Sequence, residues 1–247
     1  MSLPESAKRR YLVVNADDFG LSPGVNQGII QSFESGIVRS ASLMIRQPAA
    51  SDAADYARSR YPEVGVGLHL DLGEWAYRSG EWVTLYEVVS LEDQAALDVE
   101  VDRQIDEFIR LMGHTPTHLD SHQNVHMYEP LRSIVRSAAA QLRVPLRRLT
   151  PGLQYCGDFY GQTREATPLP DALSSAALID LLRQLAPGVT EFSCHPGLDR
   201  ELSSAYRDER LLEVNSLCNP AVLSVVTALG ITLCSFPTAP AIATRDH

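Results

Sequence analysis

The chain has 247 residues, 45% of them apolar, which is enough material for one large hydrophobic core. Its net charge of −10 and pI near 5.1 argue against a general nucleic-acid or anionic-membrane binder, because such proteins need a basic face. No apolar run reaches the roughly 18 residues of a membrane span, and no signal peptide is recognisable. Four cysteines without CxxC spacing suit a reducing compartment, so we expect a cytoplasmic protein.

Short apolar runs alternate with amphipathic stretches along the chain. The runs that predict strands are 11–16, 40–45, 64–70, 117–121, 145–149, 191–194 and 231–236. The stretches that predict helices are 22–36, 49–60, 91–112, 129–142, 171–185, 207–217 and 220–229. The connection 71–90 is irregular, rich in aromatic residues and too long for a simple link, so we expect it to be functional. A second long loop, 150–170, is rich in glycine and proline.

This alternation predicts a single α/β domain over 1–247, with flexible tails at 1–10 and 238–247. Strands separated by helices imply right-handed crossovers and a parallel sheet. A closed or nearly closed barrel of about seven strands is the preferred geometry, and a doubly wound open sheet is the alternative.

The first chemical motif is Asn15-Ala-Asp17-Asp18-Phe-Gly20, which follows the first expected strand. Adjacent carboxylates of an extended chain point in opposite directions, but at a bent junction one can bind a metal while the other reaches a water. Helix capping and turn formation are the simpler explanation, because Asp-Asp-x-Gly is common in loops.

Histidines occur at or near three other strand ends. His69 ends Gly65-Val-Gly-Leu-His-Leu, where a hydrogen-bonded core histidine is the usual occupant. The segment 117–126 holds His118, Asp120, His122 and His126, too many imidazoles to be explained by packing alone, and imidazole suits Zn²⁺ and related ions.

His195 comes next and is followed by Pro-Gly, which forces a turn. The carboxyl ends of βα strands lie at one edge, so these acids and imidazoles predict one shared site and a metal-assisted hydrolase. The chain has no dinucleotide-binding glycine motif, no P-loop and no nucleophile elbow.

Four motifs together resemble the YdjC-like carbohydrate deacetylases. They are Asn15-Ala-Asp-Asp-Phe-Gly-Leu-Ser22, Gly67-Leu-His69, Thr117-His-Leu-Asp-Ser-His122 with Val125-His126, and His195-Pro-Gly197. The resemblance covers almost the whole chain in order. It implies a distorted (β/α) barrel and one divalent ion, Mg²⁺ or Zn²⁺, that serves removal of an N-acetyl group from an amino sugar.

Carried over by position, the resemblance implies Asp18, His69 and His122 as metal ligands, Asp17 as general base and His195 as general acid. His126 remains an alternative third ligand. The family often has histidine where this chain has Asn124, so a proton-transfer role is lost there, while a hydrogen bond to sugar survives.

We expect the remaining substrate contacts at Asn15, Asn124, His126, Trp75 and Trp82, with the tryptophans offering surfaces for sugar stacking. The expected partner is an N-acetylated sugar, without nucleic acid or a membrane span, and a homodimer is an open possibility. The alternatives are a barrel metallohydrolase acting on a phosphoester or cyclic amide, and a non-catalytic sugar-binding relic. Few Arg or Lys residues at strand ends argue against a phosphatase.

Overall fold

The computed structural model describes residues 9–60 and 63–240. The strands are β1 (Arg10–Phe19), β2 (Ser40–Leu43), β3 (Gly65–Leu70), β4 (Gly73–Arg78), β5 (Glu81–Glu87), β6 (Leu119–Ser121), β7 (Leu153–Cys156), β8 (Gly188–Cys194) and β9 (Ile231–Leu233). The helices are α1 (Pro23–Glu34), α2 (Ala50–Arg60), α3 (Gln94–Met112), α4 (Leu131–Leu142), α5 (Ser175–Gln184), α6 (Glu209–Leu217) and α7 (Pro220–Ala228). A 3₁₀ segment, η2, covers His122–Met127.

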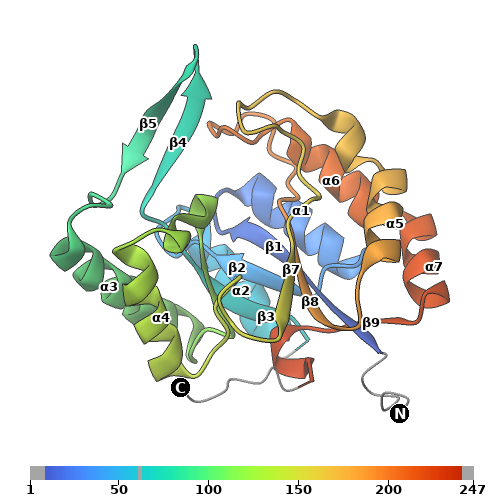
Figure 1. The fold of residues 1–247 in the computed structure, drawn as a ribbon, viewed down its shortest axis with the longest axis horizontal. Coiled ribbons are helices and arrows are strands. Elements are labelled where there is room, and N and C mark those ends of the chain that lie inside the picture. Colours follow the sequence, from blue (N-terminus) through green and yellow to red (C-terminus); the bar gives the residue numbers. More distant parts are fainter. Residues whose placement is uncertain (1–8, 61–62, 241–247) are drawn as a thin grey trace.

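The main sheet is parallel and runs in the order β6-β3-β2-β1-β8-β7, with β9 paired to the start of β1. It curls into a half-barrel, and the helices lie outside it, with α3 and α4 on one side and α5, α6 and α7 on the other (Figure 1). The central strands β1, β2, β3 and β8 are almost entirely buried, as expected of parallel strands covered on both faces. The prediction of a distorted parallel barrel is confirmed.

One predicted strand is in the wrong place. The run 145–149 contributes only an isolated bridge between Leu146 and Leu119, because Arg148 adopts a left-handed conformation with φ 62° and turns the chain away. The strand at this edge of the sheet is instead β7, which pairs with β8 and lies inside the long loop 150–170.

The second correction concerns the connection 71–90, which folds as the antiparallel hairpin β4–β5 and projects from the barrel (Figure 1). Its two-residue turn consists of Ser79 and Gly80, with φ of 55° and 92°. Positive φ at both turn residues matches the twist of a two-stranded ribbon, so this dipeptide was a readable hairpin signal.

The predicted tails are partly ordered. Arg10 belongs to β1 and pairs with Gly188 and Ile231, while Thr238 and Ser235 form a reciprocal capping box. The rest of the two predicted tails, 1–8 and 241–247, lies outside the described residues.

The helices follow the predicted boundaries closely because their caps are encoded locally. Ser22 accepts a hydrogen bond from the Val25 amide at the start of α1, and Gly113 ends α3 with φ 78°. Within 9–60 and 63–240, no single helix is long and apolar enough to cross a membrane. The bent pair α6 and α7 passes such a test by length and composition only.

Candidate active site

A local distortion of β1 turns both neighbouring carboxylates toward the barrel interior. The register between β1 and β2 shifts between Ala16 and Phe19, and Asp18 adopts φ 66°. Asp17 and Asp18 are therefore both buried, at 3% and 1% exposure. A regular strand would have sent one of them to the opposite face.

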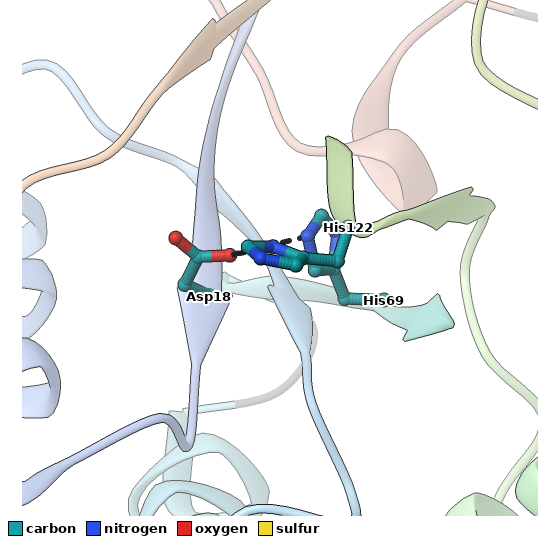
Figure 2. Close-up of side chains that lie close together, drawn as sticks. All are labelled: Asp18, His69 and His122. Carbon is teal, nitrogen blue, oxygen red and sulfur yellow. Dashed lines mark hydrogen bonds and ion pairs between the residues drawn. The ribbon is translucent and has the colours of Figure 1, made fainter. Parts of the chain in front are cut away.

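Asp18, His69 and His122 form a compact cluster, which we call the carboxylate–imidazole cluster. Asp18 Oδ1 lies 3.2 Å from His69 Nε2 and 3.1 Å from His122 Nδ1. One oxygen or nitrogen from each residue lies within 4.8 Å of the other two, and all three side chains are buried. Figure 2 shows the two imidazoles converging on the Asp18 carboxylate.

The surroundings orient this cluster for a cation. The Asp120 carboxylate lies 2.8 Å from His69 Nδ1, the usual arrangement behind a metal-binding histidine. Burial lowers the pKa of His69, but Asp120 outweighs it and raises this pKa to about 10. Asp120 thus holds the His69 ring with Nε2 directed at Asp18.

Two further observations show that a divalent ion fits these residues. Arg210 donates to Asp18 Oδ2 at 2.6 Å, which leaves Oδ1 facing the two imidazoles. Burial raises the pKa of Asp18, yet Arg210 and His122 outweigh it and hold this pKa well below its usual value. His122 Nε2 is buried without a hydrogen-bond partner among the described residues, so the ring has bonding capacity to spare.

Directly behind the cluster, Arg147 pairs with Asp17, Asp120 and Glu191, a group that we call the ion-pair network. Arg147 donates to Asp17 through both terminal nitrogens, at 2.6 and 2.7 Å, and to Glu191 through Nε at 2.6 Å. It also lies 2.7 Å from Asp120. Burial raises the pKa of Asp17, but Arg147 outweighs it and lowers this pKa, so Asp17 is ionised.

His195 follows β8 and lies against Asp17, with 3.6 Å between His195 Nε2 and Asp17 Oδ2. Glu213 of α6 supports the ring from behind: it accepts a hydrogen bond from the His195 amide and lies 3.9 Å from Nδ1. The Tyr206 hydroxyl donates to the same carboxylate at 2.5 Å. Burial lowers the pKa of His195 to about 4, so the free imidazole is neutral at pH 7.

A pocket of about 680 Å³ opens above these residues. Its walls include Asp17, Asp18, His69, Glu74, Trp82, His122, Asn124, Tyr160, His195, Ser204, Tyr206 and Arg210. Of the residues predicted to contact sugar, Trp82 and Asn124 line this pocket. Trp82 is 54% exposed, and the Asn124 side-chain oxygen has no partner within the described ranges.

Three predicted substrate contacts lie elsewhere. Asn15 is fully buried and donates to Asp17 at 2.9 Å. Trp75 packs against the hydrophobic core, with its ring over Gly73. His126 is buried and binds the Ser121 hydroxyl and the Arg147 carbonyl, at 2.7 and 3.3 Å, so it is not part of the carboxylate–imidazole cluster.

Sequence reasoning missed Arg147, Arg210, Glu213 and Tyr206. Arg147 was detectable in principle, because a basic residue in an apolar segment, 145–149, needs buried acids as partners. Arg210 and Tyr206 come from the segment after His195, which carries no motif. Only the folded chain brings Arg210 to Asp18, across 192 positions of sequence.

The chain was compared with known proteins. Residues 11–228 match the model of the family described as YdjC-like protein. A carbohydrate deacetylase from Geobacillus stearothermophilus is 33% identical, over 92% of this chain and 97% of the relative. A chitooligosaccharide deacetylase from Serratia marcescens is 32% identical, over 92% of this chain and 98% of the relative.

Solved structures agree on the fold. A protein from Enterococcus faecalis V583, provisionally assigned to cellobiose-phosphate cleavage, superposes with a TM-score of 0.71 at 27% identity, over 94% of this chain and 100% of that one. A peptidoglycan N-acetylglucosamine deacetylase superposes with a TM-score of 0.60 at 11% identity, over 94% and 89% of the two chains, which shows a shared fold alone. By the extent of the family match and the identity of its relatives, the chain belongs to the YdjC-like family.

Proposed function

We propose that this protein is a metal-dependent carbohydrate N-deacetylase, which hydrolyses the acetamido group of an amino sugar. The observation that carries the proposal is the buried carboxylate–imidazole cluster beside an ionised Asp17 at the wall of one pocket. The relatives named carbohydrate and chitooligosaccharide deacetylase support the same reaction and a sugar substrate.

Asp18, His69 and His122 would hold the ion. Two imidazoles and one carboxylate match the three protein ligands of a catalytic zinc site, whereas Mg²⁺ prefers oxygen ligands, so Zn²⁺ is the better candidate of the two ions. A divalent ion supplies a Lewis acid that polarises the acetyl carbonyl and acidifies the attacking water. No covalent nucleophile is needed.

Asp17 is the proposed general base. Arg147 fixes both of its oxygens, and Asn15 donates to Oδ1, so the carboxylate has one orientation. Because Asp17 is ionised, it can take a proton from the water that attacks the acetyl carbon.

His195 is the proposed general acid, although its ring is a neutral imidazole before the reaction and not the usual imidazolium. Its pKa of about 4 makes the free ring neutral, so the proton for the leaving amine has to arrive during the reaction. Asp17, 3.6 Å away, is the nearest donor once it has taken the proton from water. Asp17 would thus pass this proton to His195 Nε2, and His195 would pass it to the amine nitrogen.

The proposed sugar contacts are the Asn124 side-chain oxygen and the exposed indole of Trp82, since both line the pocket. The two buried free cysteines, Cys194 and Cys234, are compatible with a reducing, cytoplasmic compartment.

The other hydrolase reactions fit less well. A phosphatase needs free cations near the reacting group. Arg147 is committed to three carboxylates and Arg210 to Asp18. Of the arginines in the described pocket wall, this leaves Arg148, which stacks on Tyr155 and is a single cation. A non-catalytic protein that only binds sugar would not need the two hydrogen bonds by which Arg147 orients Asp17.

The central test measures acetate release from N-acetylglucosamine oligomers, with added Zn²⁺ or Mg²⁺ and with chelator. We expect release by the wild type that chelator abolishes, and a loss of about 10²-fold or more in Asp17→Asn. Full activity in Asp17→Asn would rule out the proposed base. The absence of release from any N-acetylated sugar would rule out the proposed reaction.

A second test separates the ligands from their neighbours. Bound metal should fall in Asp18→Ala and His122→Ala, and should be retained in His126→Ala, which alters a nearby histidine outside the cluster. If His126→Ala loses metal and His122→Ala retains it, His126 and not His122 is the third ligand.

A further inference from the structure

Glu74 lies in the pocket wall at the base of the β4–β5 hairpin and has no part in the chemistry proposed above. The residue is only 5% exposed. Its Oε1 accepts hydrogen bonds from the Ser204 hydroxyl at 2.9 Å and from the Ala205 amide at 3.0 Å. The hairpin and the segment before α6 therefore meet at this carboxylate, across the mouth of the pocket.

The second oxygen of Glu74 is unused. Within 9–60 and 63–240, no group donates a hydrogen bond to Oε2, and no Lys, Arg or His forms an ion pair with this carboxylate. Oε2 is not one of the buried side-chain atoms that lack a partner in this part of the chain, so it faces the solvent of the pocket. A ligand in the pocket can therefore offer it hydrogen-bond donors in place of water.

The surroundings of Glu74 favour sugar hydroxyls as these donors. Trp82 projects from the same hairpin into the same pocket, with its ring about half exposed. Glu74 lies at the base of the hairpin and Trp82 near its turn, and both line the one pocket. An indole face and a carboxylate match the two surfaces of a sugar chain, which has apolar C–H faces and hydroxyls at its edges. The pocket, at about 680 Å³, has room for more than one such ring.

We propose that Glu74 is a specificity-determining residue that accepts hydrogen bonds from hydroxyl groups of a second sugar unit, next to the acetamido sugar that is hydrolysed. The proposal rests on the proposed function, because it takes an amino-sugar oligomer as the substrate. Among the described residues, the hydrogen bonds of Glu74 go to Ser204 and Ala205 and not to the carboxylate–imidazole cluster, so we assign it to substrate binding and not to bond cleavage.

The test compares Glu74→Gln with Glu81→Gln, which makes the same change at an exposed position of the same hairpin. For N,N′-diacetylchitobiose, Glu74→Gln should raise KM about tenfold with kcat nearly unchanged, because a hydrogen bond to a charged acceptor is lost. KM for N-acetylglucosamine should change by less than about twofold, and Glu81→Gln should match the wild type. An unchanged KM for the disaccharide in Glu74→Gln would overturn the proposal.

A binding measurement keeps this test independent of catalysis. Tryptophan fluorescence, from Trp75 and Trp82, can be titrated with N,N′-diacetylchitobiose in Asp17→Asn and in Asp17→Asn/Glu74→Gln. Weaker binding in the double variant supports the Glu74 assignment even if no acetate is released, a result that would contradict the proposed function alone. If Glu74→Gln impairs only binding of the fully deacetylated dimer, Glu74 recognises an ammonium group and the hydroxyl proposal is wrong.

Discussion

The ion-pair network and the carboxylate–imidazole cluster are neighbours, but the negative charge of their carboxylates is compensated in different ways. In the network, Arg147 gives each of three carboxylates a partner within 2.7 Å, and all of these groups are buried. In the cluster, one oxygen and two ring nitrogens converge on the same space. Arg147 supplies the cation of the network, although Glu191 Oε2 has no hydrogen-bond partner among the described residues. The cluster instead offers three ligand atoms that could hold a metal ion.

This difference explains how two adjacent aspartates acquire separate tasks. Asp17 and Asp18 differ by one position, yet Arg147 holds both oxygens of Asp17, while Arg210 holds only one oxygen of Asp18. The oxygen of Asp18 that Arg210 leaves free is the one that faces the imidazoles. Separate arginines thus distinguish the proposed metal ligand, Asp18, from the proposed proton acceptor, Asp17.

The largest expected effect comes from removing the centre of the network. Arg147→Met leaves Asp17, Asp120 and Glu191 without their cation, and loss of one partner of a buried pair costs about 3–5 kcal/mol. Urea unfolding should show this loss, while Arg136→Met, at an exposed position of α4, should change the free energy of unfolding by less than about 0.5 kcal/mol. A loss below about 1 kcal/mol for Arg147→Met would show that the network does not stabilise the fold.

Gly67 offers a smaller and more local perturbation. A Cβ at this position would lie 2.4 Å from the His118 ring, which stacks on Phe236 beneath the site. Gly67→Ala should therefore destabilise the protein by about 1–3 kcal/mol, with bound metal retained. Adding His118→Ala removes the clash, so the double variant should be less destabilised than the sum of the single variants. Simple additivity would contradict this explanation.

Glu213 is a buried carboxyl outside both groups, and its hydrogen-bond donors are the Tyr206 hydroxyl and the His195 amide. Burial raises its pKa from 4.5 to about 8, so between these values the folded protein keeps a proton that the unfolded chain has lost. Its contribution to stability is therefore complete below pH 4.5 and declines as the pH rises to about 8, with a slope of up to about 1.4 kcal/mol per pH unit.

Glu213→Gln should remove this part of the pH dependence of unfolding. The exposed Glu201→Gln should leave the wild-type profile unchanged. Identical profiles for Glu213→Gln and the wild type would show that Glu213 does not titrate in this range.

The site was predictable where the chemistry lies at strand ends. Asp17, Asp18, His69 and His195 follow or end buried parallel strands, and parallel strands bring their carboxyl ends to one edge. The hairpin was also readable, from Ser79-Gly80. These features depend on local sequence and on a simple topology.

Other parts of the site depend on contacts that local sequence does not encode. His118, His122 and His126 occur within nine positions, yet the first stacks on Phe236, the second reaches Asp18 and the third binds Ser121. Residue type and spacing alone do not separate these environments. The same holds for Arg210, whose helix carries no sign of its carboxylate partner.

The smallest expected effect concerns the link between the hairpin and the cluster. The Gln123 side chain accepts from the Trp75 amide at 3.0 Å and donates to the Trp75 carbonyl at 2.7 Å. Gln123 and Asn124 both have left-handed φ, at 52° and 54°, immediately after His122. The hairpin thus fixes a strained segment that begins with a proposed ligand.

Gln123→Ala should weaken metal binding by at most about tenfold, as measured by competition with a chromogenic chelator, because it loosens the backbone after His122 without removing a ligand. Gln141→Ala, on the exposed face of α4, is the matched control. If both variants bind metal as tightly as the wild type, the cluster is held by Asp18 and Asp120 alone and is independent of the hairpin. A weaker affinity for metal in Gln123→Ala would mean that the β4–β5 hairpin, which carries Glu74 and Trp82, also supports the cluster. Sugar binding at the hairpin and metal binding at the barrel would then be coupled.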